Sequence, residues 1–232
     1  MAELYLVRHA QASFHSADYD SLSALGEQQS GWLGEFFAER GIAFDVLVTG
    51  TMRRHRQTLD GILRGMGCAS GAEPVTLEGL DEYDFRALVS AFAAAHDHDP
   101  QVLAWRAEPD SKPAFYRLLK RAMLAWSADA LPGPLPESWT AFRGRIEAAA
   151  ATLQDLAAGS QRLLAISSGG AMATLLGGRL GLAADRVVDL NMQIRNSSVS
   201  HFYLNRERFL LSSWNAVPHL ERAGRDHAIS YG

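Results

Sequence analysis

The sequence has almost no cysteine, because Cys68 is the one thiol in 232 residues. A single thiol cannot form a disulfide within the chain, which fits a reducing compartment. Cys68 lies among glycine and serine at positions 65–71, a composition typical of a loop, and no base beside it would activate a nucleophile. The cysteine count therefore excludes a disulfide-stapled fold and gives no support for thiol catalysis.

Long apolar runs and a secretion signal are also missing from the sequence. The amino-terminal stretch has no basic segment followed by an apolar run and a small-residue cleavage site. No apolar run approaches the length that crosses a bilayer. We therefore expect a cytoplasmic protein.

Neither sign of charge is in large excess, because 22 basic residues face 26 acidic ones. The net charge of −4 gives no reason to expect a nucleic acid or a membrane surface as partner. Hydrophobic residues make up 47% of the chain, enough for a large core in one domain, or in one domain that carries an insertion.

Apolar runs and helical patterns alternate along the chain, which predicts an α/β protein. Buried strands are expected at residues 4–7, 44–48, 74–77, 162–166, 199–204 and 208–212. Helices are expected from residues 21–27 to about 40, from 52–58 onward, at 137–158 and at 171–180. We predict a three-layer α/β/α sandwich with a mostly parallel sheet, in which residues 86–139 form a helical insertion over the active site.

The first strand ends in an abrupt change of polarity at Arg8 and His9. Ligands of open α/β sheets bind beyond the carboxyl ends of the strands, so this cation and this imidazole are expected to face a ligand crevice. The alternative interpretation is a surface pair that closes the strand.

Two further strand ends are followed by turns that suit an anion. Residues 49–51 are small or polar and lead into a helix that begins with arginines, and a helix N-terminus favours negative charge. Residues 167–170, Ser-Ser-Gly-Gly, form a similar junction, without the Gly-Lys-Ser/Thr of a P-loop. A solvated basic helix is the alternative for the first junction.

Four carboxylates cluster at residues 78–84, where one of them can serve as a general acid and an acidic surface loop is the alternative. Residues 96–99 read His-Asp-His-Asp, but two histidines at i and i+2 suit one helix face poorly. We therefore predict no metal site.

Taken in chain order, these motifs resemble those of the histidine phosphatase superfamily, also called the phosphoglycerate-mutase-like family. Residues 6–10 are similar to its strand-end Arg-His-Gly signature, with alanine in place of glycine. Residues 22–29 resemble its Leu-Thr-x-x-Gly-x-x-Gln segment. Residues 49–58 resemble its Ser-x-x-x-x-Arg-Ala-x-Gln-Thr motif, which aligns a phosphate-binding arginine on Arg54, and residues 80–82 resemble its Leu-x-Glu.

Residues 137–143 are similar to the later Glu and Arg helix of that family, so the resemblance spans nearly the whole chain. It implies one phosphoglycerate-mutase-like domain over residues 1–232, with the helical insertion at about 86–139. It also implies a phosphorylated small molecule or a phosphoprotein as substrate and no metal or redox cofactor. The oligomeric state stays open.

The resemblance implies a role for each motif residue. His9 attacks phosphorus and forms a phosphohistidine that water hydrolyses. Arg8 and Arg54 hold the phosphoryl oxygens. Glu82 donates a proton to the leaving oxygen and later accepts one from water, with Asp81 or Asp84 as substitutes in the sequence. The expected activity is that of a phosphomonoester hydrolase.

One motif departs from the family pattern, because Ser168 stands where the second catalytic histidine is expected. The Ser168 hydroxyl and the Gly169 amide at a helix N-terminus can still donate to phosphate, but they supply no positive charge. His55 and His219 are the candidates for a compensating imidazole. The substitution predicts a reduced activity.

Two alternatives to an active histidine phosphatase stay open at this point. Residues 165–169 are close to a Gly-x-Ser-x-Gly nucleophile elbow, which would make Ser167 the nucleophile of a serine hydrolase with Asp189 and His219. The other alternative is a catalytically impaired protein that binds a phosphorylated ligand or partner through Arg8 and Arg54.

Overall fold

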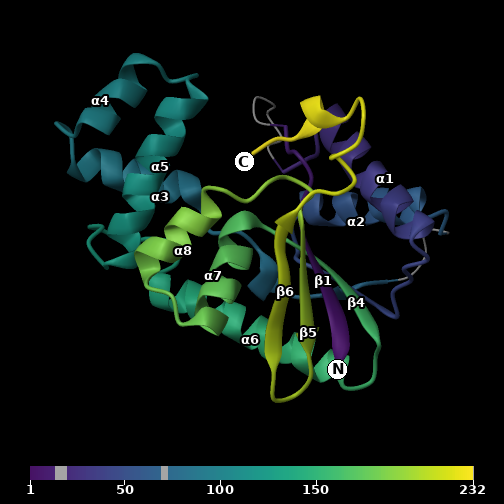
Figure 1. Cartoon of the computed structure of the whole chain (residues 1–232). Coiled ribbons are helices and arrows are strands. Elements are labelled where there is room, and N and C mark those ends of the chain that lie inside the picture. Colours follow the sequence, from purple (N-terminus) through teal and green to yellow (C-terminus); the bar gives the residue numbers. More distant parts are fainter. Residues whose placement is uncertain (14–19, 69–72, 232) are drawn as a thin grey trace.

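One mixed sheet organises the molecule (Figure 1). A computed structural model describes residues 1–13, 20–68 and 73–231. Within these residues the strand order is β3-β2-β4-β1-β5-β6. The strands are β1 (Ala2–Arg8), β2 (Val46–Thr49), β3 (Val75–Thr76), β4 (Arg162–Ser167), β5 (Val199–Leu204) and β6 (Phe209–Ala216).

The centre of the sheet is parallel, as the sequence predicts. β3, β2, β4 and β1 run parallel to one another, whereas β5 and β6 are antiparallel to their neighbours. Arg8 lies opposite Ser167 in the register of β1 and β4, and the His9 amide donates to the Ser167 carbonyl over 2.8 Å. The two central strands therefore end at the same level, which brings His9 beside the turn that follows β4.

Helices cover both faces of the sheet. They are α1 (Ala24–Glu39), α2 (Arg53–Gly65), α3 (Phe85–Ala95), α4 (Pro100–Ala107), α5 (Lys112–Ser127), α6 (Trp139–Ala157), α7 (Gly169–Leu180) and α8 (Ala184–Asn191), with short 3-10 turns η1 (Glu78–Leu80) and η2 (Asp226–Ala228). None of the described helices is long and apolar enough to cross a membrane.

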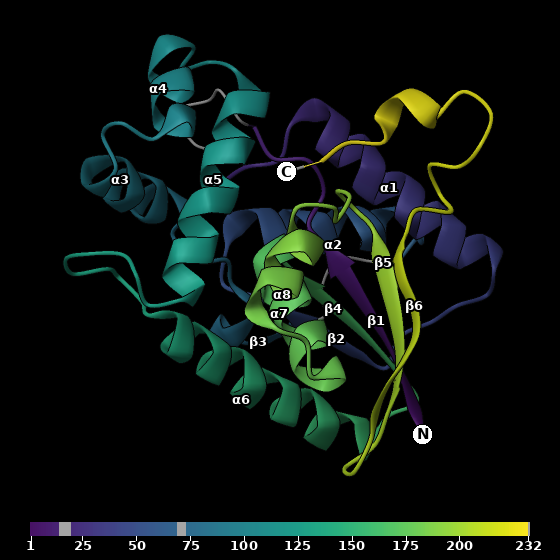
Figure 2. The ribbon, with the colours of Figure 1, turned by 60° about the vertical axis from the view of Figure 1, so that its left-hand side comes forward.

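Alternating side chains of the central strands pack in two separate hydrophobic cores, one on each face of the sheet. Leu4 and Leu6 of β1 pack in the cluster that includes α6 and α7, whereas Val7 packs with Leu33 and Ile62 of α1 and α2. Because neighbouring residues of a strand point to opposite faces, this division places helices on each side of the sheet. Figure 2 shows α1 and α2 on one side and α6 to α8 on the other, so the predicted three-layer arrangement is confirmed.

Helices α3, α4 and α5 form a group that projects beyond the sheet on the side of α8 (Figures 1 and 2). Residues 86–139, all of them described, contain these helices and no strand, as the proline-broken helical pattern predicts. Helix α8 is a feature that the sequence pattern missed. It has only eight residues, and its N-cap Ala183 provides no side-chain hydrogen bond.

Candidate active site

His9 follows β1 directly, and its ring is held in one tautomer. The Nδ1 atom lies 2.8 Å from the carbonyl oxygen of Ala10, which can only accept, so Nδ1 carries the proton. The Nε2 atom therefore keeps its lone pair. Burial, together with the charges of Arg54 and Arg8, holds the pKa of His9 well below its ordinary value of 6.5. His9 is thus a neutral imidazole with a nucleophilic nitrogen at neutral pH.

Two buried arginines lie close to this imidazole. Arg8 is 8% exposed and donates to the Ile194 carbonyl, and Arg54, in the first turn of α2, is 3% exposed. The guanidinium of Arg54 pairs with Asp20 over 2.8 Å, while the same carboxylate accepts the Arg53 amide over 2.8 Å. Two buried guanidiniums beside a neutral imidazole are suited to an anion with several oxygens.

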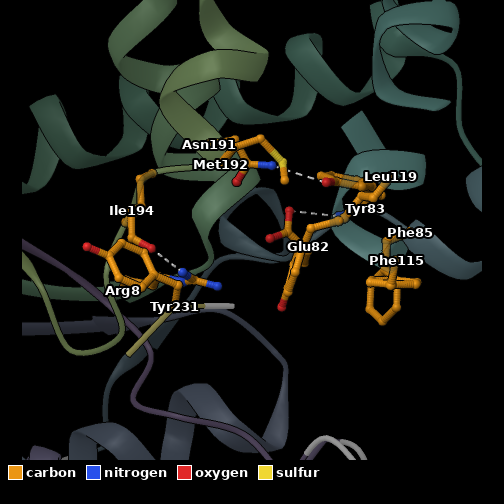
Figure 3. A pocket seen from close by; sticks show the side chains of 11 residues that line it. Arg8, Glu82, Tyr83, Phe85, Phe115, Leu119, Asn191, Met192, Ile194 and Tyr231 are labelled. Atoms are coloured by element: carbon orange, nitrogen blue, oxygen red, sulfur yellow. Dashed lines mark hydrogen bonds between the residues drawn. The ribbon is translucent and has the colours of Figure 1, made fainter. Parts of the chain in front are cut away.

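Glu82 faces the same space from the segment after η1, and its carboxyl points toward the pocket that Arg8 also lines (Figure 3). Its oxygens accept the amides of Gly170, over 3.0 Å, and Tyr83, over 3.3 Å. Burial raises the pKa of Glu82, against the opposing effects of the Gly170 hydrogen bond and of Arg54 and Arg8. A carboxyl with a raised pKa is suited to act as a general acid.

The close approach of Glu82 to α7 requires glycine at position 170. A Cβ atom there would lie 2.2 Å from Oε1 of Glu82 and 2.4 Å from a ring carbon of Tyr83. Glycine at this position therefore allows the carboxyl to reach the first turn of the helix.

A chain of three side chains joins α2 to the turn after β4. Nε2 of His55 lies 2.7 Å from the hydroxyl oxygen of Ser168, and both side chains are fully buried. On the other side of the ring, Nδ1 lies 3.5 Å from Oδ1 of Asp81. The rings of His55 and His9 have centroids 5.7 Å apart. The histidine next to Arg54 thus lies against the serine that replaces the expected histidine.

The protonation state of each group in this chain depends on its neighbour. Burial opposes the ionisation of Asp81, but the nearby His55 ring and the hydrogen bonds from Thr51 outweigh it and lower the pKa of that carboxyl. Burial lowers the pKa of His55, although Asp81 opposes the shift. The free protein therefore holds an ionised Asp81 beside a neutral His55, whose Nδ1–H faces the carboxylate and whose Nε2 accepts the Ser168 proton.

The Ser168 hydroxyl contacts His55 and does not cap the helix that follows it. Ser168 is the N-cap of α7, where a serine hydroxyl normally accepts an amide of the first turn, yet it forms no cap hydrogen bond. Gly50 provides the space for the ring, because a Cβ atom at that position would lie 2.3 Å from both Nδ1 of His55 and Oδ1 of Asp81. The first-turn amides of α7 are thereby left to other acceptors, such as Glu82.

Arg145 is a supporting residue that the sequence reasoning missed. It pairs with Glu137 over 2.7 Å and donates to the carbonyls of Glu78 (3.1 Å), Asp81 (2.9 Å) and Glu82 (3.4 Å). Arg145 thus ties α6 to the segment that positions both carboxyls. The available signal was Glu137, which precedes α6 and pairs with an arginine of that helix that lies two residues beyond residues 137–143.

Other residues from the sequence analysis do not join the site. The hydroxyl of Ser167 donates to the Leu80 carbonyl, Asp189 pairs with Lys120, and Nε2 of His219 contacts Ser197 over 2.8 Å. A serine hydrolase triad of Ser167, Asp189 and His219 is therefore wrong, because each residue has a different partner.

His219 also fails as the compensating imidazole. It is buried against the carboxyl-terminal segment, and burial with the charges of Arg225 and Arg222 lowers its pKa to about 3.

Asp84, a substitute for Glu82 in the sequence, is exposed and caps α3 by accepting the Ala87 amide over 2.9 Å.

The His-Asp run at residues 96–99 has structural contacts. His96 stacks on Phe92 with centroids 4.2 Å apart, Asp97 pairs with Arg106, and Asp99 caps α4 and pairs with Arg121. Across the described part of the chain, no group of three or more His, Cys, Asp or Glu side chains is arranged to hold a metal ion.

Comparison with known proteins identifies a sequence family. The model of the histidine phosphatase superfamily (branch 1) matches residues 4–217. No curated protein matches the chain with significant similarity.

Several solved structures share the fold at low sequence identity. A variant of the phosphoserine phosphatase from Entamoeba histolytica, in complex with phosphoserine, is 16% identical, with a TM-score of 0.62 over 95% of this chain and 100% of its own. The α-ribazole phosphatase from Shigella flexneri is 19% identical, with a TM-score of 0.62 and coverages of 93% and 96%. The phosphoglycerate mutase from Bacillus anthracis is 18% identical, with a TM-score of 0.64 and coverages of 94% and 94%. At these identities the likeness shows a shared fold.

Proposed function

Because the chain belongs to the histidine phosphatase superfamily (branch 1), we propose that it hydrolyses phosphomonoesters through a phosphohistidine on His9. The observation that carries the proposal is the state of this imidazole. Nδ1 is tied to the Ala10 carbonyl, Nε2 holds a lone pair, and both Arg8 and Arg54 depress the pKa of the ring. A neutral nucleophile between two guanidiniums is suited to attack on a phosphoryl dianion.

In the first step, Nε2 of His9 forms a bond to phosphorus while the bond from phosphorus to the ester oxygen breaks. The electron pair of that bond leaves with the oxygen, which takes the proton of Glu82. In the second step, water attacks phosphorus, its proton passes to the Glu82 carboxylate, and the bond between phosphorus and nitrogen breaks. Inorganic phosphate and the original protonation states result.

Arg8 and Arg54 bind the non-bridging phosphoryl oxygens in this proposal. Both guanidiniums are buried, so their interaction with the oxygens is little screened by solvent. Asp20 pairs with Arg54 in the free protein, and a phosphoryl group would compete for that guanidinium. Holding the charge that develops on phosphoryl oxygens is usually the largest single contribution to such catalysis.

His55 acts through Ser168 in place of the second histidine. When a phosphoryl dianion binds, the Ser168 hydroxyl turns its proton toward a phosphoryl oxygen, and Nε2 of His55 must then donate to the same hydroxyl oxygen. That donation requires a further proton on Nε2, which His55 takes up from solvent as the dianion binds, and the ionised Asp81 near Nδ1 stabilises the resulting imidazolium. In this arrangement His55 does not touch the phosphate itself, and the Ser168 hydroxyl lies between the two. We therefore call His55 a positioning residue.

Chemical trapping of the intermediate tests the proposed function. The protein is mixed with p-nitrophenyl phosphate, quenched within milliseconds, and examined for a phosphoryl group on the peptide that contains His9. We expect a phosphoramidate that is labile to acid and stable to alkali. An acid-stable, alkali-labile phosphoserine on Ser168 would instead make the serine the nucleophile, with His55 as its base. If the protein binds phosphate but does not turn over the substrate, the proposed hydrolysis is wrong and the protein is one that binds a phosphorylated ligand.

The Glu82→Gln variant separates the acid from the binding residues. We expect the rate of phosphohistidine formation, measured in a single turnover, to fall by about 10²- to 10⁴-fold for alkyl phosphates, because their alkoxide leaving groups need a proton. The loss for p-nitrophenyl phosphate is much smaller, because its phenolate leaves unprotonated. Assays on the two substrate types check this difference, and an equal loss on both would contradict the acid role.

The same variant is expected to be more stable than the wild type at neutral pH. The raised pKa of Glu82 means that ionising this carboxyl, above its ordinary value of 4.5, disfavours the folded state. Glutamine removes that cost, so the gain in unfolding free energy should be present at pH 7 and absent at low pH, below both pKa values. Urea denaturation at pH 4 and pH 7 measures it.

A further inference from the structure

A pocket of about 240 Å³ begins at the catalytic groups and extends away from the sheet toward α5 and α8 (Figure 3). Arg8 and Glu82 are among its lining residues, and the proposed function places the phosphoryl group and the leaving oxygen beside them. Because Glu82 gives its proton to that oxygen, whatever alcohol carries the oxygen must extend into this pocket. Its walls therefore decide which alcohol is accepted.

The walls beyond Arg8 and Glu82 are aromatic and aliphatic. They come from the start of α3, from α5, from the end of α8 and from the carboxyl-terminal segment. They include Phe85, Phe115, Tyr116, Leu119, Met192 and Tyr231. Among the described lining residues, Arg8 and Glu82 are the charged ones, and Asn191 is the one amide. A carboxylate or a second phosphate on the alcohol would meet the Glu82 carboxyl and no further guanidinium or ammonium group of this lining.

The size of the pocket suits one ring. An apolar cavity of about 150 Å³ holds benzene, so about 240 Å³ holds a substituted ring but not a large fused system. Phe85 and Phe115 also line a neighbouring cavity, together with Val89 and Trp105, and their rings meet edge to face with centroids 5.9 Å apart. This pair therefore separates the two cavities and limits the length of the leaving group.

We infer that the pocket selects small phosphomonoesters whose alcohol is an uncharged aromatic or apolar group of about one ring, and rejects those with a second anionic group. The inference rests on the proposed function for the position of the leaving oxygen. The rings of Phe115 and Tyr116 lie edge to face with centroids 5.5 Å apart, and both line the pocket, where an aromatic ring can pack against them.

Phosphonates test the inference without turnover, because their bond from carbon to phosphorus is not hydrolysed. Calorimetry on the full chain compares phenylphosphonate, methylphosphonate and 3-phosphonopropionate. Burial of one ring predicts that phenylphosphonate binds about 10- to 100-fold more tightly than methylphosphonate. The carboxylate of 3-phosphonopropionate should give no gain over methylphosphonate. Equal binding of the phenyl and methyl compounds, or tighter binding of the carboxylate, would overturn the inference.

Variants of the wall locate the preference in the pocket. Tyr116→Ala should lower the ratio of phenyl to methyl affinity by about tenfold, and Phe115→Ala should shift the preference by about tenfold toward 1-naphthylphosphonate by joining the two cavities. Tyr203→Ala removes a half-exposed ring of β5 outside the pocket and serves as the matched control. An unchanged ratio in both pocket variants would also overturn the inference. Because binding is measured, failure of the proposed hydrolysis would show separately, as an absence of phosphate release from phenyl phosphate.

Discussion

Replacing His9 by alanine is expected to lower kcat for phosphoester hydrolysis by about 10³-fold or more. The reason is that no other described nitrogen in the site combines a free lone pair with a lowered pKa and two adjacent guanidiniums. His55, the nearest imidazole, has its Nε2 occupied by the Ser168 hydroxyl. Steady-state assays with p-nitrophenyl phosphate and the trapping experiment should show the loss together.

The same variant should still bind phosphate. Arg8 and Arg54 are held by the Ile194 carbonyl and by Asp20, so the anion site does not depend on the His9 ring. Saturating phosphate should therefore raise the unfolding free energy of the variant, as expected for a ligand that binds only the folded state. His201→Ala, on β5 beside Glu3, is the control for loss of a histidine elsewhere. Retention of the wild-type rate in His9→Ala would disprove the phosphohistidine route.

A histidine at position 168, as in the family pattern, is expected to support activity only when His55 is also removed. His55→Ala alone is expected to lower kcat/KM by about 10²- to 10³-fold, as for the loss of one donor to a developing oxyanion. Ser168→His alone should give no gain, because His55 lies 2.7 Å from the Ser168 hydroxyl and both side chains are fully buried. A second imidazole has no space there, and overpacking of this kind typically costs about 1–3 kcal/mol.

The double variant His55→Ala/Ser168→His should recover most of the activity lost in His55→Ala. The exchange returns an imidazole to the site and removes only a hydroxyl oxygen from the pair, so the buried volume is nearly conserved. It should also change the pH profile, because Asp81 would no longer contact the working imidazole. Asp84→Asn, which alters an exposed carboxyl nearby, is the control. A double variant no more active than His55→Ala would refute the relay through Ser168.

Much of the architecture was accessible from the sequence. Strands 4–7 and 162–166 are short apolar runs bounded by polar turns, and the observed β1 and β4 contain them with one or two further residues at their ends. Strand 199–204 has the observed bounds. Helix α1 begins within the expected range of residues 21–27, where Ser23 accepts the Gly26 amide over 3.1 Å as the N-cap. These features depend on local periodicity and capping, which neighbouring residues decide.

The chemistry-bearing residues of the motifs were also visible from the sequence. Arg8 and His9 lie at the end of β1, Arg54 lies in the first turn of α2 after β2, and Glu82 follows η1 after β3. The parallel sheet brings such positions to one edge. Their placement here follows from the register of β1 with β4, which aligns Arg8 with Ser167. Their catalytic roles stay predictions that the variants above test.

The sequence by itself determined most of the elements, though not α8, as well as their order and the types of residue at the strand ends, because hydrophobic periodicity and turn composition act over a few residues. It left two histidines as equal candidates for the missing imidazole. Only the tertiary structure decided between them, since it packs α2 against the turn after β4, 113 residues away, and leaves His219 with Ser197. The walls of the pocket were decided in the same way. Phe85, Phe115 and Tyr231 are unremarkable aromatics in sequence, and long-range packing alone brings them together around Arg8 and Glu82.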